Sequence, residues 1–156
     1  MDRCGDSDLV IIMMGVAGAG KTTIGSLLAE DLGWPFYEGD DFHPQSNVDK
    51  MSQGIPLTDE DRWPWLDAIL NLVKMLLSSG RNAVIASSSL TKSYRRHLQG
   101  SDSRVVFVYL KGDYQLIGTR LEERAGHFMK ADLLESQFRI LEEPESGTTQ
   151  DIAQRP

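Results

Sequence analysis

The sequence predicts an α/β fold in which helices flank a parallel β-sheet. Short apolar runs alternate along the chain with segments that have helical apolar spacing, which is typical of a parallel sheet with right-handed crossovers. The runs at 9–14 and 104–110 are almost unbroken, as expected for strands that are covered on both faces. A glycine-rich stretch after the run at 9–14 indicates a strand–loop–helix unit.

The first half of the chain follows this pattern. Thr58 and Asp61 resemble the cap at the start of a helix, in which Trp63 and Trp65 are expected to be packing residues. Before it, "EGDDFHPQSN" is rich in acids, Gly, Pro and Asn, so we expect a functional loop. The expected elements are a strand over 9–14, a helix over 22–32, a strand over 34–37, and a helix from Thr58 to the Ser-Ser-Gly stop at 78–80.

The second half predicts two further buried strands, each followed by a helix. The expected elements are a strand over 82–89, a helix over 91–98, a strand over 104–110, a helix over 114–124, and a last strand over 148–152. The chain ends at Pro156, and we expect no helix to cover the sheet edge beside that last strand.

Composition and charge limit the classes of function. The 156 residues are 40% apolar and contain no internal repeat, which predicts one domain with a substantial core. The net charge is −7 and the lysines and arginines form no long run, so nucleic acid is not expected as a partner. Cys4 has no second thiol to pair with, and the apolar run at 9–14 is too short to span a bilayer. We therefore expect a cytoplasmic protein that acts on a small ligand and has no membrane partner.

The stretch "GVAGAGKT" at 15–22 has the spacing of a phosphate-binding loop. Its glycines let backbone N–H groups turn toward phosphate oxygens, and the following helix presents its positive N-terminus to them. Lys21 is expected to reach the β- and γ-phosphates of ATP, and Thr22 to place its hydroxyl on Mg²⁺. The expected ATP-binding residues are Gly15, Val16, Ala17, Gly18, Ala19, Gly20, Lys21, Thr22 and Thr23.

Phosphate binding alone leaves kinases, ATPases and nucleotide switches open. ATPases and switches usually carry a metal-binding acid at the end of a later strand, but the third and fourth predicted strands end in Ser87–Ser89 and Lys111–Asp113. The clearer acidic cluster, Glu38, Asp40 and Asp41, follows the second predicted strand. Asp40 is our candidate general base for a phosphate-accepting hydroxyl, and the alternative is a solvated loop acid.

A basic segment after the fourth predicted strand is a candidate lid. Arg120 and Arg124 lie four residues apart on one helical face, and a short segment with Gly126, His127 and Lys130 follows. Such a segment could close over ATP and exclude water, and pairing with acids on the surface is the alternative. The histidines have no metal-ligand spacing with one another.

Several segments together resemble the gluconate kinase family of P-loop small-molecule kinases, relatives of shikimate kinase and adenylate kinase. They cover most of residues 9–144 in the family's order, and the long acceptor-side segment is more discriminating than the phosphate-binding loop. The matching segments are "MGVAGAGKTT", "EGDDFHPQSNVDKMSQGIPLTDEDRWPWL", "SSLTKSYRRHL", "FVYLKGDYQLIGTRLEERAGHFM" and "LLESQFRILEEP".

The resemblance implies a three-layer α/β/α P-loop kinase domain with a parallel five-stranded sheet. It further implies a substrate-binding segment at residues 40–66 and a small helical lid at residues 120–137. The implied activity is the ATP- and Mg²⁺-dependent phosphorylation of D-gluconate to 6-phosphogluconate, which feeds the pentose phosphate route. A homodimer is compatible with the family.

The resemblance also assigns roles to individual residues by position. A small polyol acid needs a cation to bind its carboxylate, so there is also an independent physical reason to expect Arg62 or Lys50 to pair with that carboxylate. The implied catalytic residues are Lys21, Asp40, Arg120 and Arg124. The implied metal ligands are Thr22 and Glu38. The implied substrate-binding residues are Asp40, His43, Asn47, Lys50, Arg62 and His127.

Three departures from the family pattern leave alternatives open. Family members usually show Cys-Ser-Ala-Leu-Lys after the third strand, where this chain has Ser87–Thr91, and Lys92 need not replace the lysine. Glu38 stands where an Asp is common, and the chain stops at Pro156 where the family continues into a C-terminal helix. The alternatives are a kinase for another small hydroxylated metabolite such as shikimate, and a catalytically weakened ATP-binding protein.

Overall fold

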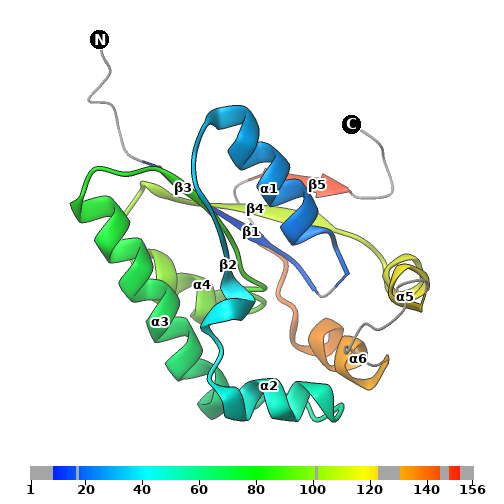
Figure 1. The fold of residues 1–156 in the computed structure, drawn as a ribbon. Coiled ribbons are helices and arrows are strands. Elements are labelled where there is room, and N and C mark those ends of the chain that lie inside the picture. The colour runs from blue at the N-terminus through cyan, green and yellow to red at the C-terminus, as the bar shows by residue number, and fades with distance from the viewer. Residues whose placement is uncertain (1–8, 17, 101, 123–130, 145–147, 152–156) are drawn as a thin grey trace.

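The fold is built on one parallel sheet of five strands, as expected. The computed structural model of the chain describes residues 9–16, 18–100, 102–122, 131–144 and 148–151. The strands lie in the order β2-β3-β1-β4-β5, with helices on both sides of the sheet (Figure 1). Their bounds are β1 Val10–Met14, β2 Phe36–Glu38, β3 Ala83–Ala86, β4 Val105–Lys111 and β5 Thr148–Asp151.

Helices cover both faces of the sheet. The helices are α1 Lys21–Leu32, the 3-10 helix η1 Gly39–Phe42, α2 Gln45–Ser52, α3 Asp59–Ser78, α4 Lys92–Gln99, α5 Tyr114–Glu122 and α6 Ala131–Ile140. α3 and α4 share one core with the sheet, in which Trp65, Ile69 and Leu98 are buried. α1, α5 and α6 contribute Ala29, Ile117 and Leu134 to a second core. Among the described residues, no helix is long and apolar enough to cross a membrane.

The central strand β1 has no polar face. Val10 is in register with Ala83 of β3 on one side and with Val105 of β4 on the other. Ile12 belongs to the core beneath α3 and α4, whereas the next residue, Met13, belongs to the core on the opposite face. Both faces are therefore buried, which accounts for the unbroken apolar run in the sequence.

The acidic stretch after β2 is helical, so the prediction of a loop there is wrong. Glu38 precedes η1, and its side chain accepts a hydrogen bond from the backbone N–H of Asp40 at 3.2 Å. Pro44, with φ of −64°, stands directly before α2, where it leaves no helical N–H unsatisfied. Local capping contacts therefore order a segment whose composition is typical of a loop.

The start of α3 confirms the predicted cap. The backbone N–H of Asp61 donates to the Thr58 hydroxyl at 3.1 Å, and the N–H of Thr58 donates to the Asp61 carboxylate at 2.9 Å. These reciprocal bonds satisfy two donors that a helix start leaves free. They fix the point at which the chain turns back toward the sheet.

Gly39 lets η1 approach β3 closely, and its replacement should destabilise the fold. A Cβ at residue 39 would lie 2.1 Å from the backbone oxygen of Ala86, which no side-chain rotation can relieve. We expect Gly39→Ala to lower the free energy of unfolding by about 1–3 kcal/mol or more, measured by urea denaturation. The matched control is Gly118→Ala on α5, where the nearest atom would be 3.9 Å away. That control should be neutral or stabilising, because Ala favours a helix. Equal transition midpoints for the two variants would contradict the close approach.

Candidate active site

The candidate site lies where the chain leaves the carboxyl ends of β1, β2 and β3. β1 leads into α1 on one face of the sheet, whereas β3 leads into α4 on the other. Parallel α/β sheets bind ligands at such points of divergence. The N–H of Gly15, after β1, donates to the carbonyl oxygen of Ser88, after β3, at 3.2 Å. This hydrogen bond holds the two diverging loops together.

Two glycines shape the loop between β1 and α1. Gly15 has φ of 150°, and a Cβ there would lie 2.9 Å from the backbone oxygen of Leu110. Gly20 has φ of 99°, in the region that favours glycine, and directly precedes α1. The loop therefore delivers the chain to a helix N-terminus whose free N–H groups and dipole favour an anion. Ala17 lies outside the described residues.

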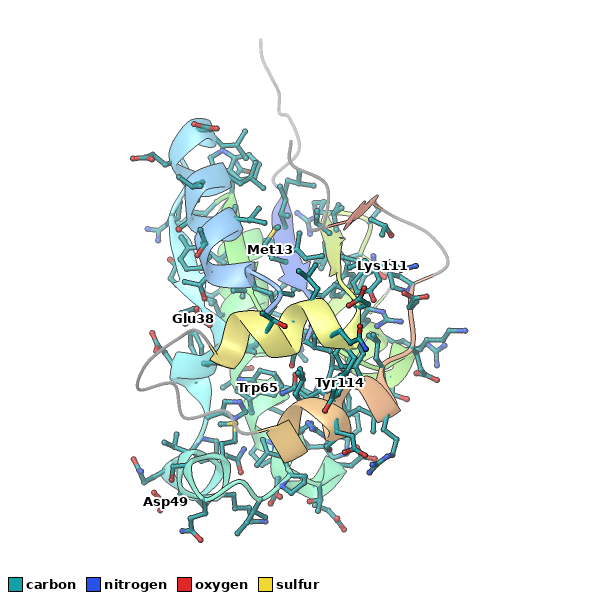
Figure 2. The ribbon with its side chains drawn as sticks, turned by 90° about the vertical axis from the view of Figure 1, so that its right-hand side faces the viewer. Met13, Glu38, Asp49, Trp65, Lys111 and Tyr114 are labelled. Carbon is teal, nitrogen blue, oxygen red and sulfur yellow. The ribbon has the colours of Figure 1, made fainter. Side chains whose placement is uncertain are left out.

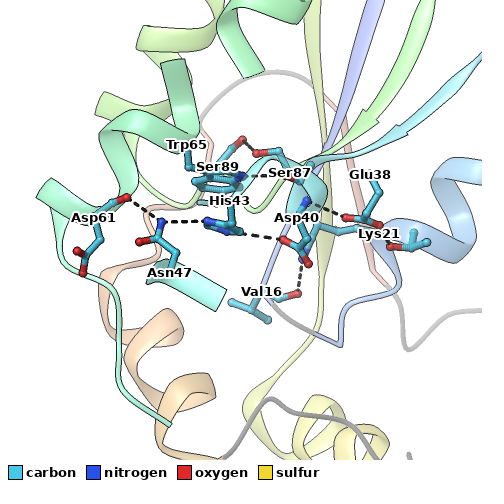
Figure 3. A network of polar contacts seen from close by, with 12 residues as sticks. Val16, Lys21, Glu38, Asp40, His43, Asn47, Asp61, Trp65, Ser87 and Ser89 are labelled. Carbon is cyan, nitrogen blue, oxygen red and sulfur yellow. Dashed lines mark hydrogen bonds and ion pairs between the residues drawn. The ribbon is translucent and has the colours of Figure 1, made fainter. Parts of the chain in front are cut away.

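Lys21 folds back over this loop. Its Nζ donates to the backbone oxygens of Gly15 at 2.9 Å and Val16 at 3.0 Å. Desolvation lowers the pKa of the Lys21 ammonium, while the carboxylates of Asp40 and Glu38 act in the opposite direction. Figure 3 shows Lys21 on the same side of the loop as these two carboxylates. Phosphate oxygens could replace the loop carbonyls as partners of this ammonium.

Glu38 connects α1 to η1. The hydroxyl of Thr22 donates to Oε1 of Glu38, and Oε2 accepts the hydrogen bond from the N–H of Asp40. The two expected metal ligands, Thr22 and Glu38, are therefore in contact. Their hard oxygen atoms suit Mg²⁺, which proteins usually hold through one or two side chains together with phosphate oxygens.

His43 lies at the centre of a buried network on the acceptor side (Figure 3). Its ring stacks on the indole of Trp65 with 4.2 Å between ring centroids. Asn47 places its amide nitrogen 3.1 Å from Nδ1 of His43 and 2.8 Å from the backbone oxygen of Asp61. Trp65 also donates from Nε1 to the backbone oxygen of Gly39 at 2.8 Å. Trp65 therefore does more than the packing expected from the sequence, because it supports both η1 and His43.

Lys50 already has a carboxylate partner within the chain. Its Nζ lies 2.8 Å from Oδ2 of Asp61. Hydrogen bonds from Lys50 and from the Thr58 backbone lower the pKa of Asp61 to about 2. Lys50 thus joins α2 to the cap of α3, beside the contact that Asn47 makes to the same residue.

Arg62 is buried between α3 and α4, with 8% of its surface exposed. Its Nη1 donates to the hydroxyl of Tyr94 at 3.2 Å, and this hydroxyl donates in turn to the carboxylate of Asp59. Within the described ranges, no carboxylate forms a direct ion pair with Arg62. A guanidinium with one phenol as its side-chain partner has donors left for an anion.

His43 should make the stability of the fold depend on pH. Burial lowers the pKa of His43 to about 4, with an opposing effect of Asp40 and a further decrease from Arg62. The unfolded chain titrates near 6.5, so between that pH and about 4 it binds more protons than the folded chain. The contribution of His43 to the free energy of unfolding is complete above pH 6.5 and should fall by about 3 kcal/mol across this window.

Urea denaturation of the wild type and His43→Phe at several pH values tests this prediction. The free energy of unfolding of the wild type, minus that of His43→Phe, should fall as the pH falls below 6.5. Titrating carboxylates are common to both proteins and cancel in this difference. A difference that is independent of pH would contradict the low pKa.

The serine segment after β3 has an unusual geometry. Ser89 has φ of 46°, which is rare for a residue with a side chain, and its hydroxyl donates to Oγ of Ser87 at 3.2 Å. The buried guanidinium of Arg95 donates to the backbone oxygens of Ser89 at 2.8 Å and Glu142 at 2.7 Å. Arg95 therefore ties the loop after β3 to the segment after α6. Arg95 is not among the site residues predicted from the sequence, and its place in the family-like "SYRRHL" was the available signal.

The predicted lid lies partly outside the described residues. Arg120 belongs to α5, while Arg124 and His127 fall in the range 123–130, which the structure does not describe. Tyr114 of α5 packs on Phe138 of α6 with 5.5 Å between ring centroids. Figure 2 shows these two helices side by side, with Tyr114 at the start of α5. This contact joins α5 to α6, the two helices that the predicted lid at 120–137 partly includes.

Known proteins are similar to this chain in sequence and architecture. The family described as "Shikimate kinase" matches residues 17–154. The thermosensitive gluconokinase of Escherichia coli (strain K12) is 50% identical over 141 residues, which cover 90% of this chain and 75% of that protein. A crystal structure of a gluconokinase from Sinorhizobium meliloti 1021 has a TM-score of 0.85 and 42% identity, over 94% of this chain and 84% of that one. A sugar kinase from Janibacter sp. HTCC2649 has a TM-score of 0.89 and 41% identity, over 96% and 88%.

The fold and the site together define a P-loop small-molecule kinase. The phosphate-binding loop follows the central strand β1, and an acidic cluster follows the edge strand β2, which β3 separates from β1. Relatives at this level of identity extend over most of the sequence. The chain belongs to the gluconokinase family within this class.

Proposed function

We propose that the protein transfers the γ-phosphoryl group of ATP to D-gluconate and forms 6-phosphogluconate. The observation that carries this proposal is the position of Asp40 between the two halves of the site. Its backbone N–H binds Glu38 on the nucleotide side, and its carboxylate lies 3.9 Å from Nε2 of His43 on the acceptor side. The kinship with gluconokinases supports gluconate as the acceptor.

On the nucleotide side, the loop and the start of α1 would hold ATP. Backbone N–H groups of the loop and the ammonium of Lys21 would bind the phosphate oxygens. Thr22 and Glu38 would hold Mg²⁺, which when bound neutralises charge on the β- and γ-phosphates. The proposed ATP-binding residues are Gly15, Val16, Ala17, Gly18, Ala19, Gly20, Lys21, Thr22 and Thr23.

On the acceptor side, Asp40 would accept the proton of the gluconate hydroxyl that attacks the γ-phosphorus. The new O–P bond forms as the bond between the γ-phosphorus and its bridging oxygen breaks, and ADP leaves. Arg62 is the best candidate for the gluconate carboxylate, because it is buried and has unused donors. We propose residues 40–66 as the substrate-binding segment, which also contains His43, Asn47 and Lys50.

We propose that residues 120–137 form the lid of a single kinase domain. Arg120, Arg124 and His127 would neutralise the transferring phosphoryl group and contact the acceptor when the lid excludes water. The packing of Tyr114 on Phe138 supports this proposal, because it joins the helices α5 and α6 to which the lid belongs in part.

A coupled assay of ADP release tests the proposed function. We expect release that depends on gluconate, and only background rates with shikimate or AMP as acceptor. Release with shikimate alone would favour the related-kinase alternative. Binding of ATP in calorimetry by a folded protein that turns over none of the three acceptors would favour a weakened ATP-binding protein.

Two further predictions concern assembly and location. We propose a homodimer, with which the family resemblance is compatible, and light scattering of the purified protein tests it. We propose a cytoplasmic location, which the lone cysteine and the use of ATP support. Cell fractionation with an antibody against the chain tests that location.

A further inference from the structure

The His43 ring is held from several sides, which leaves it one orientation. The indole of Trp65 covers one face with an interplanar angle of 13°, and Asn47 approaches Nδ1. Only 4% of the His43 side chain is exposed, whereas 64% of the Asp40 side chain is exposed. A ring so enclosed has little surface to offer to a substrate. Its Nε2 edge faces Asp40 (Figure 3).

The contacts of Asn47 determine which nitrogen of His43 carries the proton. The backbone oxygen of Asp61 can only accept, so the Asn47 atom that lies 2.8 Å from it is the amide nitrogen. The same nitrogen lies 3.1 Å from Nδ1 of His43 and can only donate to it. Nδ1 therefore accepts, and the neutral ring carries its proton on Nε2.

We propose that His43 is a positioning residue for Asp40, and that its Nε2–H directs the Asp40 carboxylate toward the acceptor hydroxyl while Asn47 fixes the tautomer. This inference rests on the proposed function. The separation of 3.9 Å between Nε2 and Oδ1 is longer than a hydrogen bond. A small rotation of the exposed Asp40 side chain closes it. The arrangement differs from the substrate-binding role that the family resemblance implies for His43.

A neutral donor suits this task better than a cation. An imidazolium beside Asp40 would favour the carboxylate anion and weaken it as a proton acceptor. Burial and the nearby Arg62 both oppose protonation of His43, while Asp40 favours it. The net balance keeps the ring neutral at neutral pH, so it can orient Asp40 without competing for the proton.

Two substitutions at residue 43 separate positioning from substrate binding. His43→Phe keeps the stacking on Trp65 and loses the donor, whereas His43→Gln keeps an N–H of similar reach. We expect His43→Phe to lower kcat about tenfold or more with the KM for gluconate within about threefold, since misplaced catalytic groups cost rate. His43→Gln should recover a substantial part of kcat. A raised KM with unchanged kcat in both variants would show a direct substrate ligand and overturn the inference.

The ring nitrogens of the wild-type protein provide a readout that needs no turnover. In ¹⁵N NMR spectra, His43 should show a protonated Nε2 and an unprotonated Nδ1 at neutral pH. The chain has three histidines, and the wild-type signals that disappear in His97→Gln and in His127→Gln leave the remaining one as His43. If neither His43 variant folds, this measurement on the wild type still decides, because a protonated Nδ1 would overturn the assignment.

The two proposals fail in different ways. A folded wild-type protein without gluconate-dependent ADP release would overturn the proposed function. A normal wild-type rate together with a proton on Nδ1 would overturn only the role given to His43.

Discussion

Replacing Lys21 with methionine should lower kcat for gluconate phosphorylation by about 10³-fold or more. The ammonium lies over the loop carbonyls and beside the acidic cluster. From there it can stabilise the negative charge on the transferring phosphoryl group. Fixed cations at this place in phosphoryl transfer contribute rate enhancements of this order. Methionine keeps the length of the side chain and removes its charge. Steady-state ADP release, with folding checked by circular dichroism, measures the effect.

The matched control for this substitution is Lys74→Met, at an exposed position on α3. It removes one positive charge, as Lys21→Met does, but at a position distant from the phosphate-binding loop. It should change kcat by less than about twofold, because exposed surface charges interact only weakly with other groups. Equal losses in the two variants would point to net charge rather than to the position of Lys21.

Replacing Asp40 with asparagine should lower kcat by about 10²–10⁴-fold, the usual range for a general base. Asparagine keeps the shape of the side chain but cannot accept the proton of the acceptor hydroxyl at neutral pH. The Asp40 side chain is 64% exposed, so the urea midpoint should change little. The affinity for ATP, measured by calorimetry, should also change little.

Asp31→Asn is the control for this loss of one carboxylate. Asp31 is exposed near the end of α1, on the side away from the loop. Its variant should keep the wild-type rate. If Asp40→Asn retained most of its activity, Asp40 would be the solvated acid that the sequence left as the alternative.

Burial on both faces made the sheet predictable from the sequence. The apolar runs of β1 and β4 and the cap formed by Thr58 and Asp61 are local signals, and each led to the correct element. The stretch that forms η1 and α2 was missed because its order comes from capping contacts and from the indole of Trp65. Composition alone does not show such contacts.

The residues of the candidate site could be proposed from the sequence, but their contact partners could not. The loop spacing and the family resemblance selected Lys21, Asp40 and Arg62. In the structure Lys21 lies over the loop carbonyls, Asp40 is exposed and Arg62 is buried. The pairing of Lys50 with Asp61 links residues 11 positions apart, and the bonds of Arg95 reach Glu142, 47 positions away. Contacts over such separations depend on the tertiary fold, which periodicity does not encode.

The central place of β1 also bears on how the protein folds. Val10 pairs with Ala83 and with Val105, so β1 is synthesised long before either neighbour in the sheet. Until both arrive, a strand with two apolar faces has no cover, and such segments favour aggregation. Closing these long loops slows folding of parallel sheets. We therefore expect the phosphate-binding loop to reach its final conformation late in folding. Until then β1 remains exposed and open to aggregation.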